Sequence, residues 1–363
     1  MIYTDVLIVG GGPSGLTAAK MCCEAGLSTI IVERSHILGG QLTKQTHKFF
    51  GSKDQYAKMR GIDIAVKLQE DLASFNTLTM MLETTVVGLY EDKVVTILQH
   101  NEYKKIKAKA IILATGASEK FLAFENNDLP QIVGAGALQT LVNLYQVIPG
   151  KSMVMIGSGN IGLIVSYQML QAGIEVKKVI EATNRIGGYK VHASKLKRLG
   201  VDIQTRKTIK RAIGKDQLEA VEIVSIDENF QEIEGTSEII ETDLLCVSVG
   251  LSPLHQLASM MNCKTTYISE LGGFVPLIDD HFQCSVPGVF ACGDMIGIEE
   301  ASSAMMEGYL AGLYTCNYLN QPHLEAESLI SHYENQLYEL RNGLFGRKTL
   351  RGIEKRKENL LHA

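Results

Sequence analysis

Two glycine-rich segments, each directly after an apolar run, constrain the fold of this 363-residue chain more than any other feature. The first reads Gly-Gly-Gly-Pro-Ser-Gly over 10–15 after Val-Leu-Ile-Val, and the second reads Gly-Ser-Gly-Asn-Ile-Gly over 157–162 after Met-Val-Met-Ile. In a strand–turn–helix unit the first glycine makes the tight turn, the second lets the backbone approach a ligand, and the third lets the helix pack on the sheet. Each segment therefore predicts a βαβ unit and a parallel sheet.

A carboxylate follows each glycine segment at the end of the next apolar run. Glu33 ends Thr-Ile-Ile-Val, and Glu181 ends the run 176–180. This spacing of roughly 20 residues is typical of dinucleotide sites, in which the pyrophosphate lies at the helix N-terminus and the carboxylate accepts a hydrogen bond from a ribose hydroxyl. The chain is thus expected to bind two nucleotides, which points to electron transfer.

Composition fits a two-domain α/β protein. Hydrophobic residues make up 45% of the chain, and its net charge of -5 argues against a nucleic-acid partner. No apolar run approaches the roughly 18 residues of a membrane span, and residues 1–5 lead straight into the first strand without an export signal. The seven cysteines form no Cys-x-x-Cys, so we expect reduced thiols, a cytoplasmic location and no metal site.

The strand pattern after the first glycine segment recurs after the second. Strands are expected over 78–83, 86–90, 94–99 and 103–108 with a returning strand at 110–116, and then over 218–226 and 231–234 with a returning strand at 243–250. The fold predicted is α/β, with two nested Rossmann-like three-layer domains that each carry an antiparallel β-meander. The first domain would comprise 1–117 and 251–322, the second 118–250, and a helical basic tail 323–363.

The later sequence resembles the flavoprotein family with two dinucleotide-binding domains that includes thioredoxin reductase, of the pyridine nucleotide-disulfide oxidoreductase superfamily. Gly293-Asp294 matches the family's Gly-Asp after a late strand, the segment 39–43 is similar to its flavin-contacting loop, and Thr115-Gly116 matches its Ala-Thr-Gly. The resemblance covers roughly residues 1–320. It implies FAD at the first glycine segment and NAD(P) at the second.

The cysteine positions exclude both disulfide mechanisms of that family. Thioredoxin reductase has a Cys-x-x-Cys shortly before its second fingerprint, and residues 130–150 contain no cysteine. The glutathione-reductase branch places its pair after the Gly-Gly loop, and residues 41–50 contain none either. The flavin is therefore expected to pass electrons directly to a substrate, a second nucleotide, oxygen or a partner protein.

The segments 129–140, 148–151 and 297–308 resemble FAD-binding alpha-type subunits of sarcosine oxidase, opine oxidase, hydrogen cyanide synthase and dye-linked proline dehydrogenases. This resemblance implies an oligomer with a second flavoprotein or iron-sulfur subunit that oxidises an amine or imino acid. Several relatives carry a C-terminal cysteine-rich iron-sulfur module. Here no cysteine follows Cys316, so any cluster would come from another polypeptide.

The sequence and the resemblance together assign two sets of binding residues. For FAD they are Gly10, Gly12, Pro13, Ser14, Gly15, Glu33, Arg34, Gly40, Gln41, Leu42, Thr115, Gly116, Gly293, Asp294 and Ala301. For NAD they are Gly157, Gly159, Asn160, Ile161, Gly162 and Glu181. Glu181 favours NAD(H) because a carboxylate repels a 2′-phosphate, whereas nearby Arg185 leaves NADP(H) open, and the resemblance also allows ATP.

Catalytic groups are harder to identify, because hydride transfer to a flavin depends mainly on positioning. Lys44 and His47 follow the Gly-Gly-Gln loop, where a cation near the isoalloxazine ring would stabilise an anionic reduced flavin. The alternative is that both are solvated loop residues. In the tail, basic residues from Arg341 to Lys357 alternate with apolar ones, as in a solvated, partly frayed tail or, alternatively, an arm that docks an acidic partner.

The function expected is that of a FAD-dependent, NAD(P)-linked oxidoreductase, or an electron-transfer subunit of an amine or amino-acid dehydrogenase, that moves electrons between NAD(H), flavin and a partner. One alternative is an NAD(P)H:ferredoxin-type reductase. Another is a non-catalytic assembly or regulatory flavoprotein in which the nucleotides stabilise the fold.

Overall fold

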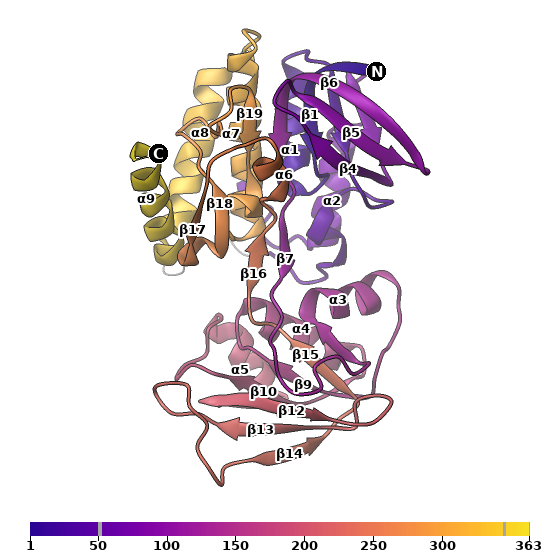
Figure 1. Cartoon of the computed structure of the whole chain (residues 1–363), viewed down its shortest axis with the longest axis vertical. Coiled ribbons are helices and arrows are strands. Elements are labelled where there is room, and N and C mark those ends of the chain that lie inside the picture. The colour runs from indigo at the N-terminus through magenta and orange to yellow at the C-terminus, as the bar shows by residue number, and fades with distance from the viewer. Residues whose placement is uncertain (50–52, 344–345, 363) are drawn as a thin grey trace. The chain divides into compact units, whose positions relative to one another are not determined.

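The computed structural model describes residues 1–49, 53–343 and 346–362. The chain folds into two compact units. The first unit consists of Met1–Thr43, Lys48–Ser118 and Leu251–Ala363, and the second consists of Lys44–His47 and Glu119–Gly250. Figure 1 shows that the first unit is built from both ends of the chain, indigo to purple and orange to yellow, and that the middle of the chain, magenta to salmon, forms the second.

A seven-stranded sheet forms the centre of the first unit, in the order β3-β2-β1-β6-β5-β4 with β19 on β6. β19 and the strands β3, β2, β1 and β6 pair in parallel, whereas β4, β5 and β6 form an antiparallel meander. The bounds are β1 Ile2–Val9, β2 Thr29–Val32, β3 Leu78–Met81, β4 Thr84–Leu89, β5 Val94–Gln99, β6 Glu102–Leu113 and β19 Val289–Ala291.

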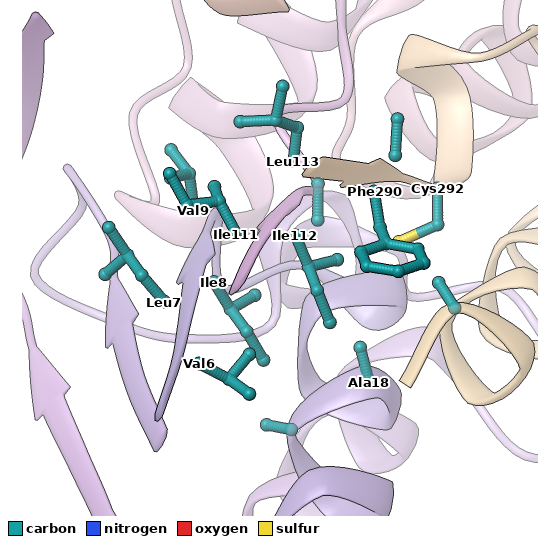
Figure 2. Close-up of a cluster of buried hydrophobic side chains, with 14 of the residues drawn as sticks. Val6, Leu7, Ile8, Val9, Ala18, Ile111, Ile112, Leu113, Phe290 and Cys292 are labelled. Carbon is teal, nitrogen blue, oxygen red and sulfur yellow. The ribbon is translucent and has the colours of Figure 1, made fainter. Parts of the chain in front are cut away.

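Apolar side chains of the parallel strands form the core of the first unit. Figure 2 shows residues of β1 and β6 together with Phe290, Cys292 and Ala18. The helix after the glycine segment, α1 (Pro13–Glu24), lies against α7 (Ala301–Tyr318), where Thr17 Oγ1 donates to the carbonyl of Met305 at 3.0 Å. Further elements of this unit are α2 Gly61–Glu70, β16 Leu251–Pro253, α6 Gln256–Met260, β17 Thr265–Ile268 and β18 Gly273–Pro276.

The second unit repeats this plan with a five-stranded parallel sheet in the order β11-β10-β9-β15-β8. A separate antiparallel sheet, β12-β13-β14, forms its meander. The strands are β8 Ile132–Gly134, β9 Ser152–Ile156, β10 Glu175–Glu181, β11 Asp202–Thr205, β12 Lys207–Ile213, β13 Ala220–Ser225, β14 Glu238–Glu241 and β15 Leu244–Val247. The helices are α3 Ala135–Gln139, α4 Asn160–Gln171 and α5 Lys190–Arg198. The short strand β7 (Ala117–Glu119) lies where the chain passes from the first unit to the second.

The structure confirms the predicted fold class, but the second meander differs from the prediction. Residues 231–234 form no strand; Ile226 and Glu232 make one isolated bridge. The Asp227 carboxylate accepts the N–H groups of Asn229 and Gln231, both at 2.8 Å, and so closes a turn there. The meander instead consists of β12, β13 and β14. Strand β12 was not predicted because lysine and arginine interrupt its apolar pattern.

The C-terminal segment is not a solvated, frayed tail. It forms the helices α8 (Ala326–Asn342) and α9 (Arg347–Leu361). Arg356 of α9 is 6% exposed, and Lys355 and Lys357 form ion pairs with Glu270 and Asp280 of the same unit. These basic groups are therefore bound within the chain. Residues 344, 345 and 363 of the predicted tail lie outside the described residues.

Within the described ranges, no helix is both long and apolar enough to cross a membrane. Nor do those ranges contain three His, Cys, Asp or Glu side chains grouped so that they would hold a metal ion.

Candidate functional site

The first and third glycines of each fingerprint are required by close backbone contacts. Gly10 has φ +111°, and a Cβ there would lie 2.3 Å from the carbonyl oxygen of Ala114. A Cβ on Gly15 would lie 1.9 Å from the carbonyl oxygen of Gly10. Gly157 and Gly162 of the second fingerprint have the equivalent contacts, at 2.1 Å from Ser248 O and 2.2 Å from Gly157 O. Any side chain at these positions would break the turn between strand and helix.

The middle glycine of each fingerprint has space in front of it. A Cβ on Gly12 would have Gly40 Cα as its nearest neighbour, at 4.0 Å, and a Cβ on Gly159 would meet nothing within 4 Å. Gly12 and Gly159 are the N-caps of α1 and α4, and neither helix has a side-chain hydrogen bond at its cap. The free N–H groups of a first helical turn stabilise negative charge. The structure thus leaves room for a phosphate at both helix N-termini.

Both predicted ribose-binding carboxylates lie beside their fingerprints. Glu33 accepts hydrogen bonds from the N–H groups of Gly11 and Ser35, both at 2.8 Å. Glu181 accepts from the N–H groups of Ser158 and Thr183, both at 3.0 Å, and from Ser158 Oγ at 2.6 Å. Burial of Glu181 opposes ionisation, but these hydrogen bonds outweigh it and hold the pKa of the carboxyl below its usual value. Glu181 is therefore negative at neutral pH.

A second glycine pair, Gly187 and Gly188, completes the second site, although it was not among the predicted binding residues. The N–H of Gly188 donates to Ser158 O at 2.8 Å, and that of Tyr189 donates to Asn160 Oδ1 at 2.8 Å. In the first unit Gly39 N–H donates to Gly11 O at 2.7 Å. Gly187 and Gly188 follow Glu181 much as Gly39 and Gly40 follow Glu33. That repeated order was the sequence signal available for them.

The Gly-Asp loop reaches the first fingerprint. Gly293 has φ +74°, and a Cβ there would lie 2.5 Å from Ser14 Oγ. Asp294 is half-buried. Burial, reinforced by the charges of Glu299 and Glu300, raises the pKa of its carboxyl to about 7 although the N–H of Glu299 lowers it. Among the described residues, no lysine, arginine or histidine side chain forms an ion pair with this carboxyl.

The other predicted FAD residues lie in different surroundings. Thr115 Oγ1 donates to Leu254 O at 2.8 Å, and Gly116 has φ +73° with open space at its Cβ position. Arg34 and Gln41 are exposed, whereas Leu42 is fully buried in the core of the first unit and serves packing. Of the other predicted residues, Pro13 and Ala301 are the first residues of α1 and α7, and Asn160 and Ile161 are the first two residues of α4.

Lys44 and His47 pack within the second unit. Lys44 Nζ donates to Gly136 O at 2.8 Å and to Thr140 Oγ1 at 3.2 Å, so it is not a solvated loop residue. Burial lowers the pKa of Lys44, partly offset by the charge of Glu119. Burial, with the nearby His192, lowers the pKa of His47 to about 4. His47 is thus neutral at pH 7, which leaves Lys44 as the cation of the two.

All seven cysteines are free thiols and all are buried. Burial raises the pKa of Cys246 and Cys292. A raised pKa disfavours the nucleophilic thiolate. Cys246 and Cys292 are thus unsuited to disulfide exchange with an external substrate.

Comparison with known proteins gives the same classification. A model of the pyridine nucleotide-disulphide oxidoreductase family matches residues 4–308. The chain is 28% identical over 328 residues to the sarcosine oxidase alpha subunit of Corynebacterium sp. (strain P-1), covering 86% of this chain and 32% of that protein. It is 24% identical over 369 residues to an opine oxidase subunit of Rhizobium meliloti (strain 1021), covering 92% and 78%.

Among solved structures, thioredoxin reductase of T. acidophilum superimposes with a TM-score of 0.72 at 21% identity, covering 88% of this chain and 99% of that one, which shows a shared fold. The chain spans about a third of the length of the sarcosine oxidase alpha subunit. The match over most of its length shows that this chain belongs to the pyridine nucleotide-disulphide oxidoreductase family.

Proposed function

We propose that this protein is a FAD-dependent electron-transfer subunit that takes part in oxidation of an amine or imino acid and exchanges electrons with NAD(H). Family membership implies binding of FAD and a pyridine nucleotide. The observation that carries the proposal is the repeated arrangement of glycine turn, open helix N-terminus and carboxylate in each unit. We assign FAD to the first unit and NAD(H) to the second.

The residues of the first unit fit FAD. The gap in front of Gly12 and the N–H groups of α1 suit a pyrophosphate, and Glu33 suits a ribose hydroxyl. Asp294, whose pKa is raised by burial, suits hydroxyl groups of the ribityl chain. Bound FAD would supply the two-electron chemistry, and these residues would hold and orient it. The buried thiols favour a route that bypasses any dithiol.

A partner subunit is part of the proposal. The relatives' names describe subunits of sarcosine oxidase and opine oxidase, so a second flavoprotein that binds the amine substrate is the partner we infer. We place the complex in the cytoplasm, because all seven thiols are free, as is usual in reducing compartments.

The test is an anaerobic titration of the purified protein with NADH, and separately with NADPH, while the visible absorbance of the flavin is followed. We expect NADH to bleach the flavin and NADPH to do so at much higher concentration. If neither nucleotide bleaches a bound flavin, the second unit is not a working nicotinamide site. A purified protein that neither carries nor binds FAD would refute the proposal altogether.

Substitution of Glu181 tests the second site. We expect Glu181→Ala to raise the apparent Kd for NADH about 10-fold, the cost of one lost hydrogen-bond acceptor of roughly 1.4 kcal/mol. The flavin should stay bound. Glu181→Gln removes the charge that repels a 2′-phosphate, so it should narrow the preference for NADH over NADPH. Glu228→Ala, at a side chain 90% exposed in the same unit, is the control. Unchanged NADH binding in Glu181→Ala would contradict this assignment.

A further inference from the structure

The C-terminal helices α8 and α9 lie beyond the family match, which ends at residue 308. Each places one arginine against the segment 293–299, which contains the Gly-Asp loop of the first unit. These are Arg341, with a side chain 13% exposed, and Arg356, which is 6% exposed. Buried arginines are rare unless they are paired, so their contacts here require an explanation.

Arg341 bridges two carboxylates. Its Nη2 donates to Glu299 Oε1 at 2.6 Å and also to Glu307 Oε1, and its Nε donates to Glu299 Oε1 at 3.1 Å. The side chains of Glu299 and Glu307 are 9% and 2% exposed. Because all three groups are shielded from water, loss of Arg341 would leave two buried carboxylates without their ion-pair partner.

The second oxygen of Glu307 holds the Gly-Asp loop directly. Glu307 Oε2 accepts the N–H of Gly293 at 2.9 Å. Gly293 is the residue whose α-carbon faces Ser14 in the first fingerprint. One carboxylate therefore links α8, through Arg341, to the backbone that carries Asp294.

Arg356 holds the same segment at a second point. Its Nη1 donates to the carbonyl of Ile296 at 2.7 Å. Together the contacts fix the segment at Gly293, Ile296 and Glu299. They also place the positive charges of Arg341 and Arg356 close to Glu299 and Glu307. Without these charges the two carboxylates would repel the phosphates of a dinucleotide.

We propose that α8 and α9 are part of the flavin site, with Arg341 and Arg356 as positioning residues that hold the segment 293–299 in its binding conformation and offset its negative charge. This inference rests on the proposed binding of FAD to the first unit. It predicts that FAD affinity depends on two side chains that do not touch the flavin themselves.

The experiment measures the Kd of FAD for the apo-protein by flavin fluorescence quenching, and the melting temperature of the same apo-protein. We expect Arg341→Gln to raise the Kd of FAD at least 10-fold. Arg341→Lys keeps the charge and should recover most of the affinity. The double variant Arg341→Gln/Glu307→Gln removes the stranded charge while the amide oxygen still accepts from Gly293, so it too should bind FAD better than Arg341→Gln. Lys355→Gln, at an exposed ion pair of α9, should bind like the wild type.

A purely structural role predicts a different pattern. It would lower the melting temperature of Arg341→Gln while the Kd of FAD stayed within about twofold of the wild type, and that result would overturn the inference. If Arg341→Gln fails to fold, the comparison passes to the double variant, which also lacks the arginine and should bind FAD more weakly than both the wild type and Arg341→Lys. Equal affinity of the double variant and the wild type then overturns the inference as well. A wild-type protein that binds no FAD would instead refute the proposed function.

Discussion

Alanine at Gly15 is expected to prevent stable folding of the first unit. Its Cβ would lie 1.9 Å from the carbonyl oxygen of Gly10, and both atoms belong to a turn fixed between β1 and α1. Overpacking a rigid site costs about 1–3 kcal/mol and sometimes more, and a backbone clash this close should cost more than about 3 kcal/mol. Soluble yield and thermal melting followed by circular dichroism measure the effect.

The matched variant Gly12→Ala separates folding from ligand binding. The nearest atom to its new methyl group is Gly40 Cα at 4.0 Å, so the apo-protein should melt within about 2 °C of the wild type. The methyl group would, however, enter the space assigned to the pyrophosphate, and we expect the protein to be purified without flavin. Normal FAD binding by Gly12→Ala would show that the pyrophosphate does not approach this glycine. If Gly15→Ala were as stable as the wild type, the close contact between residue 15 and the carbonyl oxygen of Gly10 would be contradicted.

Replacing Asp294 by asparagine should move FAD affinity and apo-protein stability in opposite directions. The folded state raises the pKa of this carboxyl from 3.8 to about 7. Between about pH 4 and pH 7 the folded protein therefore holds a proton that the unfolded chain has lost, and stability falls as the pH rises through that window. An asparagine cannot lose a proton, so it removes this decline.

At pH 8 we expect apo Asp294→Asn to melt several degrees Celsius above the wild type, and the two proteins to converge near pH 4. Loss of the carboxylate should raise the Kd of FAD about 10-fold, and Asp294→Ala should release the flavin. Asp280→Asn, at an exposed side chain paired with Lys357, is the control for both measurements. A variant less stable than the wild type at pH 8 would show that Asp294 is already well compensated in the apo-protein.

The glycine turns, the helices after them and the carboxylates were predictable because each depends on residues close together in sequence. Gly10 and Gly15 clash with atoms of the same short loop, and Glu33 bonds to that loop from the end of the neighbouring parallel strand. Local spacing therefore carries the information. The buried strands were equally predictable, because β1, β2, β9 and β15 each contain an uninterrupted apolar run.

The features that could not be predicted depend on partners distant in sequence. The basic residues from Arg341 to Lys357 indicated a solvated tail, whereas Arg341 is buried because it forms ion pairs with Glu299 and Glu307. His47 was a candidate cation until its burial showed that it is neutral at pH 7. The strand β12 is stabilised by its pairing with β13 along its length, not by its own composition. Composition alone does not reveal such long-range partners.

The split of the first unit between the two ends of the chain affects how the protein is made. Strand β19 pairs with β6 through Val289 and Ile111, and α7 packs on α1, but β19 and α7 leave the ribosome only after the whole second unit. At about 5–20 residues per second, the nascent first unit must wait many seconds with an exposed sheet edge and an uncovered helix. The second unit, continuous but for Lys44–His47, is free to fold first. A stalled or truncated polypeptide would thus contain a folded centre between unfolded flanks, a species that chaperones and proteases recognise.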